Sequence, residues 1–339
     1  MFARPALPAP RPRAIATWLS LVAALVFLMV VVGGITRLTE SGLSITRWEP
    51  IAGAIPPLDA AAWQAQFDAY KASPQYQLMN HGMTLADFKA IFFWEYVHRL
   101  LARLIGLAFA LPLAFFWWRR AIPEGFGWKL GGILALGALQ GGIGWWMVAS
   151  GLVDRPEVSH IRLAVHLLTA LLIFASMIWV SLDLAARAKP PLLAIWALCA
   201  LFLQFMFGAY VAGLDAGYAF NTWPKMGDDW YPAGAQWLEP ALRNFADNPV
   251  TVQFVHRWLA FVVASFAVTL GVRAWRRGLR LEAAALIGAV CAQITLGILT
   301  LLSGVQIDIA VGHQGMGVLL LAAMVTTAHR LGEPPAATA

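Results

Sequence analysis

Eight long apolar segments restrict what this 339-residue chain can fold into. Each runs for about 20 residues, the length that an α-helix needs to cross the hydrocarbon core of a membrane. Only 12% of the residues are charged, about half the share of an ordinary soluble protein. The sequence therefore predicts an all-α, polytopic membrane protein with transmembrane helices near residues 14–34, 92–118, 128–149, 159–182, 190–213, 251–274, 281–303 and 309–330.

The first apolar segment is interpreted as a helix and not as a secretory signal peptide. It is longer than the apolar core of a signal peptide, and no cleavage site of the A-x-A kind follows it. Residues 1–13 are rich in proline and arginine, and we expect them to form a disordered cytoplasmic tail. Residues 331–339 form the second predicted cytoplasmic tail.

Lysine and arginine gather in the short loops on one side of the predicted membrane, from Arg119, Arg120 and Lys129 to Arg273, Arg276, Arg277 and Arg280. Such a bias marks the cytoplasmic side, so both termini are expected there. The long loops 35–90 and 214–250 then face outward. Because topology explains the net charge of +6, no nucleic-acid partner is expected. The two cysteines, Cys199 and Cys291, lie within apolar segments, where we expect buried packing.

The second half of the chain repeats the first. Gly33, Gly42 and Trp48 recur 175 residues later as Gly208, Gly217 and Trp223. Similar matches join His98-Arg99 to His256-Arg257, and Gln140, Gly144, Ser150 and Gly151 to Gln293, Gly297, Ser303 and Gly304. We therefore predict two tandem four-helix bundles, residues 14–182 and 190–330. Each has an even number of spans, so a pseudo-two-fold axis along the membrane normal relates them.

Four histidines, His98, His166, His256 and His313, lie on the second and fourth predicted helices of each repeat, in the outer half of the membrane. Two imidazoles facing each other across a bundle make an axial pair for haem iron. A single membrane histidine is more often a hydrogen-bonding group, but four at equivalent places favour ligation. Zinc or copper is less attractive, because few further ligands lie nearby. His160 is interpreted as a surface residue at a helix end, and His81 and His329 as background residues.

Glu95 precedes His98 by one helical turn, whereas the matching position before His256 is Gln253. Residues three apart share a helix face, so this asymmetry predicts chemistry in the first half, with Glu95 as its catalytic acid or base. An ion pair of Glu95 with Arg99 or Arg37 is the alternative. Four arginines at the outer edge are candidate partners of haem propionates, with lipid or loop contacts as the alternative: Arg37, Arg99, Arg162 and Arg257.

Seven motifs, taken together, resemble the haem A synthase family of bacterial and mitochondrial membranes. They are residues 33–45 (GGITRLTESGLSI), Pro56-Pro57, residues 95–99 (EYVHR), residues 162–167 (RLAVHL), residues 221–226 (NTWPKM), residues 254–257 (FVHR) and residues 312–314 (GHQ). They span nearly the whole chain in the family's order. The Gly-rich segments among them are expected to be turns at helix ends.

The resemblance implies that the substrate, haem O, binds between His98 and His166 beside Glu95. It also implies a prosthetic haem b between His256 and His313. The implied reaction oxidises a methyl group of haem O to the formyl group of haem A for cytochrome oxidase, through two hydroxylations and loss of water. This chain lacks the cysteine pairs that some relatives carry in their outer loops, so its electron donor is unidentified.

The implied location is a bacterial inner membrane, because residues 1–13 do not resemble an organelle transit peptide. Besides haem and the lipid bilayer, haem O synthase and oxidase assembly factors are the partners that the family implies. Two alternatives stay open. A bis-histidine, di-haem electron-transfer cytochrome explains the histidines but not the difference between Glu95 and Gln253. A transporter or haem exporter would place ionisable groups through the depth of the membrane, whereas here they lie on one side.

Overall fold

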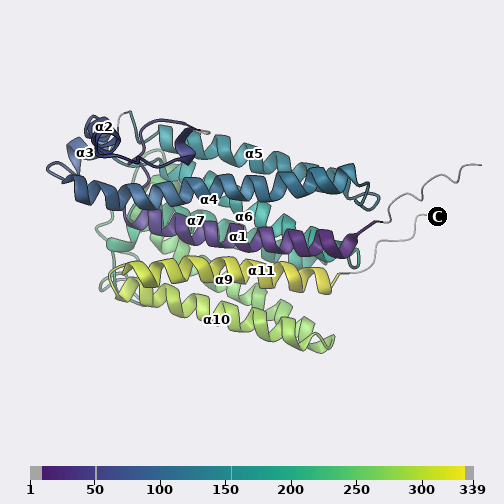
Figure 1. Ribbon diagram of the computed structural model, residues 1–339. Helices are drawn as coiled ribbons and strands as arrows, with labels where there is room; N and C mark the ends of the chain where they lie inside the picture. Colours follow the sequence, from purple (N-terminus) through teal and green to yellow (C-terminus); the bar gives the residue numbers. More distant parts are fainter. Residues whose placement is uncertain (1–9, 50–51, 154, 333–339) are drawn as a thin grey trace, which may run out of the picture.

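The computed structural model describes residues 10–49, 52–153 and 155–332. Within them, eight helices are long and apolar enough to cross a membrane, and they lie side by side (Figure 1). They are α1 (Pro12–Leu38), α4 (Leu85–Trp118), α5 (Gly127–Ala149), α6 (His160–Asp183), α7 (Leu192–Gly213), α9 (Pro249–Arg276), α10 (Arg280–Leu302) and α11 (Ile307–Arg330). The prediction of an all-α membrane protein with eight spans is confirmed. The predicted tails lie mostly outside the described residues.

One boundary differs clearly from its prediction. Helix α4 begins at Leu85, seven residues before the predicted start, because Thr84 and Asp87 form a capping box that satisfies its first N–H groups. The long loop before it contains α2 (Ala60–Lys71) and α3 (Pro74–Leu78). Phe67 and Tyr70 of α2 pack on Phe88 of the early α4 turns. This packing forms a small outer cap above the first bundle.

The prediction that both cysteines are buried is wrong. Cys199 on α7 and Cys291 on α10 are free thiols with exposed side chains. Both helices present an apolar outer face in this region, with Leu203 and Leu299 also exposed. A small apolar side chain such as cysteine suits a lipid-facing surface as well as a protein core.

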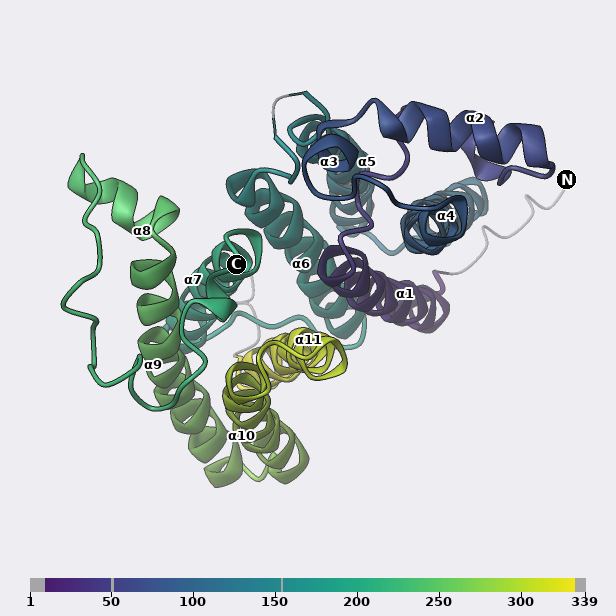
Figure 2. The same ribbon diagram turned by 90° about the vertical axis from the view of Figure 1, so that its left-hand side faces the viewer.

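The helices fall into two groups when seen end-on (Figure 2). The first group contains α1, α4, α5 and α6, and the second contains α7, α9, α10 and α11. Helix α6 packs on α7 and α11, and α1 packs on α11, so these contacts join the groups. The buried residues of these helices form one continuous core.

The ends of α1 and α7 resemble each other at the spacing of the sequence repeat and also contact each other. Glu40 and Asp215, which are 175 residues apart, follow α1 and α7 and both have a left-handed backbone, with φ of 52° and 50°. Arg37 donates from Nη2 to the carbonyl oxygen of Ala212 at 2.9 Å, and Ala212 is its own counterpart 175 residues on. The relation of the halves by a two-fold axis stays a prediction.

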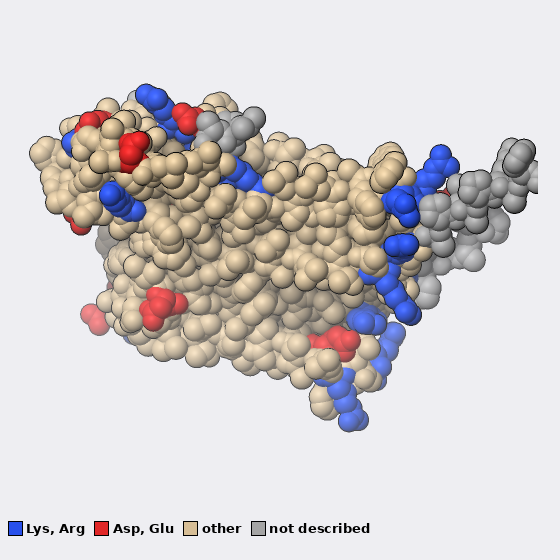
Figure 3. Space-filling view, viewed as in Figure 1, with Lys and Arg blue, Asp and Glu red and all other residues tan. Residues whose placement is uncertain are grey.

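Basic side chains gather at the end of the molecule where the described chain begins and ends (Figures 1 and 3). One buried charge network lies at this end. The Asp183 carboxylate accepts from Nζ of Lys129 at 2.5 Å and lies 3.0 Å from Nε2 of His329. Asp183 and His329 are both buried, so the expectation that His329 is a background residue is wrong. The network links α5, α6 and α11, and thereby the two groups.

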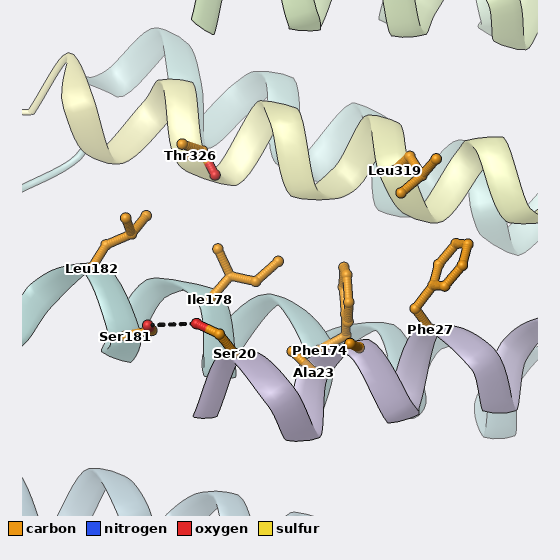
Figure 4. A pocket seen from close by; sticks show the side chains of 10 residues that line it. Ser20, Ala23, Phe27, Phe174, Ile178, Ser181, Leu182, Leu319 and Thr326 are labelled. Atoms are coloured by element: carbon orange, nitrogen blue, oxygen red, sulfur yellow. Dashed lines mark hydrogen bonds between the residues drawn. The ribbon is translucent and has the colours of Figure 1, made fainter. Parts of the chain in front are cut away.

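An apolar cavity of about 430 Å³ lies between α1, α6 and α11. Phe27, Phe174 and Leu319 line it, and the Ser20 and Ser181 hydroxyls, 3.1 Å apart, lie at one side (Figure 4). None of the four candidate histidines lines this cavity. The cavity is therefore a feature of the contact between the two groups and is separate from the candidate site.

We expect Asp183→Ala to lower the apparent midpoint of thermal unfolding in detergent. Removing the carboxylate leaves Lys129 and His329 without their partner, and breaking such a buried pair costs on the order of 3 kcal/mol. Circular dichroism measures the midpoint. Asp68→Ala is the matched control, because its ion pair with Lys71 is exposed and exposed pairs contribute little. Equal midpoints for both variants would contradict a stabilising role of the buried network.

Candidate haem site

The four predicted ligand histidines lie on four different helices. Three of them, His166 on α6, His256 on α9 and His313 on α11, lie about two turns after the start of their helix. His98 lies farther along α4, because that helix begins earlier to carry the outer cap. All four side chains are partly buried.

Each imidazole packs against a glycine on a neighbouring helix. The pairs are Gly33 on α1 with His98, Gly144 on α5 with His166, Gly208 on α7 with His256, and Gly297 on α10 with His313. A Cβ atom added at any of these glycines would lie between 2.9 and 3.2 Å from Cε1 of its histidine. No larger residue fits without moving the ring, so the glycines fix where the imidazoles stand. They are also counterparts in the sequence repeat.

The His256 and His313 rings are 6.4 Å apart between centroids and nearly perpendicular, at 89°. An iron bonded to both rings requires centroids about 6 Å apart, given metal–imidazole bonds of about 2 Å. Nδ1 of His313 lies 3.2 Å from the backbone oxygen of Gln293. Donation from Nδ1 to that oxygen leaves Nε2 with its lone pair for a metal. The pair therefore fits the axial positions of a haem.

His98 on α4 and His166 on α6 pack against Gly33 and Gly144 in the same group of helices. Their Nδ1 atoms are buried and have no hydrogen-bond partner among the described residues. The described part of the chain contains no group of three or more histidine, cysteine, aspartate or glutamate side chains that could hold a metal ion. Two histidines per half suit a haem, whose porphyrin supplies the other ligands, better than a bare metal ion.

Arg99 ties the loop after α1 to helix α4. Its Nη2 donates to the carbonyl oxygen of Ile45 at 2.9 Å, and its Nη1 donates to that of Arg47 at 3.2 Å. A planar guanidinium can hold two carbonyl groups at once in this way. The contacts hold this loop against the turn of α4 that carries His98 and Arg99.

Arg257 makes the equivalent contacts in the second half. Its Nη2 donates to the carbonyl oxygen of Phe220 at 2.8 Å, and its Nη1 donates to that of Thr222 at 2.9 Å. Phe220 and Thr222 are the counterparts, 175 residues on, of Ile45 and Arg47. We call these two sets of contacts the arginine clamps. Contact of either arginine with a haem propionate stays a prediction.

The carboxylate of Glu95 is buried, with 2% of the residue exposed. Its Oε1 pairs with Nη2 of Arg99 at 2.6 Å. Its Oε2 accepts from the Ser44 hydroxyl and from the backbone N–H of Ile45, both at 2.7 Å. The ion pair that the sequence left open is therefore formed with Arg99. Glu95 is part of the first arginine clamp, and its role in catalysis stays a prediction.

Gln253 occupies the matching place in the second clamp with fewer contacts. Its Nε2 donates to the carbonyl oxygen of Phe220 at 2.9 Å. Its Oε1 is buried without a partner among the described residues. The two halves thus share one framework but differ in charge at this position.

The other two candidate arginines lie near helix ends, Arg37 in the last turn of α1 and Arg162 in the first turn of α6. Arg37 pairs with Asp215 at 3.0 Å across the contact between the halves. Arg162 donates to the carbonyl oxygen of Trp146 at 2.7 Å and lies over the Trp146 ring. Neither side chain is fully buried, and their contact with a propionate also stays a prediction.

Two glycines and one histidine near the site differ from their predictions. Gly33 and Gly34 lie inside α1 and not in a turn, and Gly33 serves as a contact surface for His98. The recurrence of glycines at matching places was the available signal. His160 begins α6 as expected, but its side chain is largely buried and lies 3.2 Å from Asp247 of the second half.

Comparison with known proteins agrees with this arrangement. The COX15-CtaA family, described as a cytochrome oxidase assembly protein, matches residues 16–325. The chain belongs to this family. A haem A synthase of Rhizorhabdus wittichii is 56% identical over 98% of this chain and 99% of its own length. Haem A synthases of Sphingopyxis alaskensis and Novosphingobium aromaticivorans are 49% and 48% identical, over 97% and 96% of this chain and 95% and 99% of their own lengths.

We expect Gly208→Val to abolish the bis-imidazole absorption of haem in the purified protein. The added side chain would occupy the position of the His256 ring, whose Cε1 lies 3.0 Å from a Cβ at this site. Gly288→Val on α10 is the control, because a Cβ there meets nothing within 4 Å. An unchanged spectrum in folded Gly208→Val would contradict the packing of His256 on this glycine.

Proposed function

We propose that this protein is a haem A synthase of a bacterial inner membrane, an oxidoreductase that converts a methyl group of haem O to the formyl group of haem A. The observation that carries the proposal is the pair of equivalent histidine sites in a chain that matches haem A synthases over nearly its whole length. The substrate is haem O, the product is haem A, and haem b is the resident cofactor. The electron donor is a separate partner.

The first unit, residues 14–182, carries the substrate site at His98 and His166. Two differences between the halves support this assignment. A carboxylate, Glu95, is present only in this half at the position one turn before the histidine. Helices α4 and α5 also contact each other much less than their counterparts α9 and α10 do. A substrate that arrives and leaves through the lipid needs such a separable pair of helices.

The second unit, residues 190–330, carries the resident haem b at His256 and His313. When bound, haem b supplies a one-electron carrier close to the substrate half. The side chains of this unit hold the cofactor in place: Gly208 and Gln293 fix the two rings, and Arg257 fixes the loop above them. The close packing of α9 and α10 suits a cofactor that does not leave the protein.

Within the substrate half, Glu95 would hold or move a proton at its carboxylate oxygens. The first arginine clamp keeps this carboxylate at a fixed place one turn from His98, and a positioned acid or base of this kind assists hydroxylation or loss of water. The outer cap of α2 and α3 covers the loop that the clamp holds, since Gln75 donates to the carbonyl oxygen of Glu40 at 3.0 Å. The cap would limit access of water to the site.

The proposed orientation places both termini in the cytoplasm and the histidine sites toward the outer face. The gathering of lysine and arginine at the end with the described termini supports it. Haem O synthase and oxidase assembly factors would then meet the protein in or at the membrane. A di-haem electron-transfer cytochrome is less well supported, because it gives no reason for Glu95 in one half only.

The function is tested in a host that makes haem O but no haem A. We expect the protein to produce haem A there, measured by extraction and mass analysis. His98→Ala and His166→Ala should abolish haem A while leaving most haem b bound. His256→Ala and His313→Ala should lose haem b itself. Equal loss of haem b in all four variants would contradict separate substrate and cofactor halves, and absence of haem A with the unaltered protein would contradict the function.

Glu95→Gln is expected to accumulate haem O or a hydroxylated intermediate while keeping haem b. The amide preserves shape but neither titrates nor pairs as an ion with Arg99. Haem extraction, normalised to bound haem b, measures the effect. Asp183→Asn is the control, because it removes another buried, ion-paired carboxylate at the opposite end of the protein. Near-normal haem A from Glu95→Gln would contradict the role of this carboxylate.

A further inference from the structure

We propose that Gln204 is a positioning residue that makes His256 a permanent haem ligand, and that Met29, its counterpart in the first half, leaves His98 free to release its haem. The inference rests on the proposed function, which assigns the resident haem to the second half. It adds a reason why one of two equivalent sites retains haem while the other exchanges it.

Gln204 lies on α7 one turn before Gly208, so both residues face His256. Its Nε2 donates to the backbone oxygen of His256 at 2.9 Å and lies 3.2 Å from Nδ1 of the same residue. One amide group therefore bridges the ring and the main chain of His256. This contact restricts rotation of the imidazole, which also packs against Gly208 on the same helix.

An imidazole that binds a metal through Nε2 carries its proton on Nδ1 and needs an acceptor there. Gln204 can supply one, because its Oε1 is buried without a partner among the described residues. Rotation of the amide would present this oxygen to Nδ1–H, in exchange for the bond between Nε2 and the backbone oxygen of His256. Such a hydrogen bond orients a ligating ring and increases its basicity. His313 has the corresponding contact with the backbone oxygen of Gln293.

The first half has the main-chain contact at His166 but not at His98. Gln140 on α5, one turn before Gly144, donates from Nε2 to the backbone oxygen of His166 at 3.0 Å. Met29 stands 175 residues before Gln204 and one turn before Gly33, but a thioether donates no hydrogen bond and accepts only weakly. Nδ1 of His98 and Nδ1 of His166 have no partner in the part of the chain that the structure describes. Both second-half rings thus have a contact at Nδ1, and neither first-half ring does. His98 differs further, because its glycine is preceded one turn earlier by Met29, whereas a glutamine stands at this place for each of the other three histidines. A less firmly held His98 suits a haem that must leave as product.

The test exchanges these side chains in the full-length protein purified with its haem b. Gln204→Met should release haem b to an excess of apomyoglobin about 10–100-fold faster, the usual effect of losing such a contact. It should also raise the midpoint potential of haem b, because the ligand becomes less basic. Gln204→Glu provides a stronger acceptor and should lower the potential. Leu203→Met, on the exposed face of α7, is the control and should change neither.

The reciprocal variant, Met29→Gln, should slow the release of haem from the first half and leave haem A bound to the protein. If Gln204→Met retains too little haem to titrate, the sign of the potential shift in Gln204→Glu decides. Unchanged release and potential in Gln204→Met would overturn the inference while leaving the proposed function intact. Loss of the resident haem in His98→Ala but not in His256→Ala would instead overturn the assignment of the halves.

Discussion

The close packing of an imidazole on a glycine of a neighbouring helix sets how the helices of each half approach one another. It occurs four times, and each time a glycine provides the space. The four helix pairs that contain these contacts, α1 with α4, α5 with α6, α7 with α9 and α10 with α11, are among the most closely packed in the protein. In a membrane, where apolar side chains gain little from leaving lipid, close packing at small residues is a main source of helix association. The glycines that allow the close packing of these helices therefore also position the four histidines.

On this common framework, the two halves differ in the side chains that surround their histidines. The arginine clamps hold equivalent loops through equivalent carbonyl groups, so the loop above each site has the same support. Within the clamps, a charged carboxylate at Glu95 replaces the amide of Gln253. Around the rings, Met29 replaces Gln204. These differences change the charge at one position and the hydrogen bonding at the other, on counterpart helices of one fold.

Much of this arrangement could be predicted from the sequence. Length and apolar character located all eight spans, and the repeat identified the four histidines and the matching glycines. The early start of α4 was missed because it depends on a capping box and on packing of Phe88 beneath α2, neither of which an apolar run shows. His329 was missed because its partner, Asp183, is 146 residues away. The partner of Glu95 was left open, since only the folded loop places Ser44 and Arg99 around one carboxylate.

If the first half exchanges haem and the second half retains it, the two halves must differ when fresh haem is supplied. The purified protein is incubated with haem O that contains ⁵⁷Fe, free haem is removed, and bound haem is measured by isotope-resolved mass analysis. We expect one labelled haem per chain, bound only when His98 is present, while the iron of haem b stays unlabelled. Displacement of haem b by the labelled haem, or binding that survives His98→Ala and is lost in His256→Ala, would contradict it.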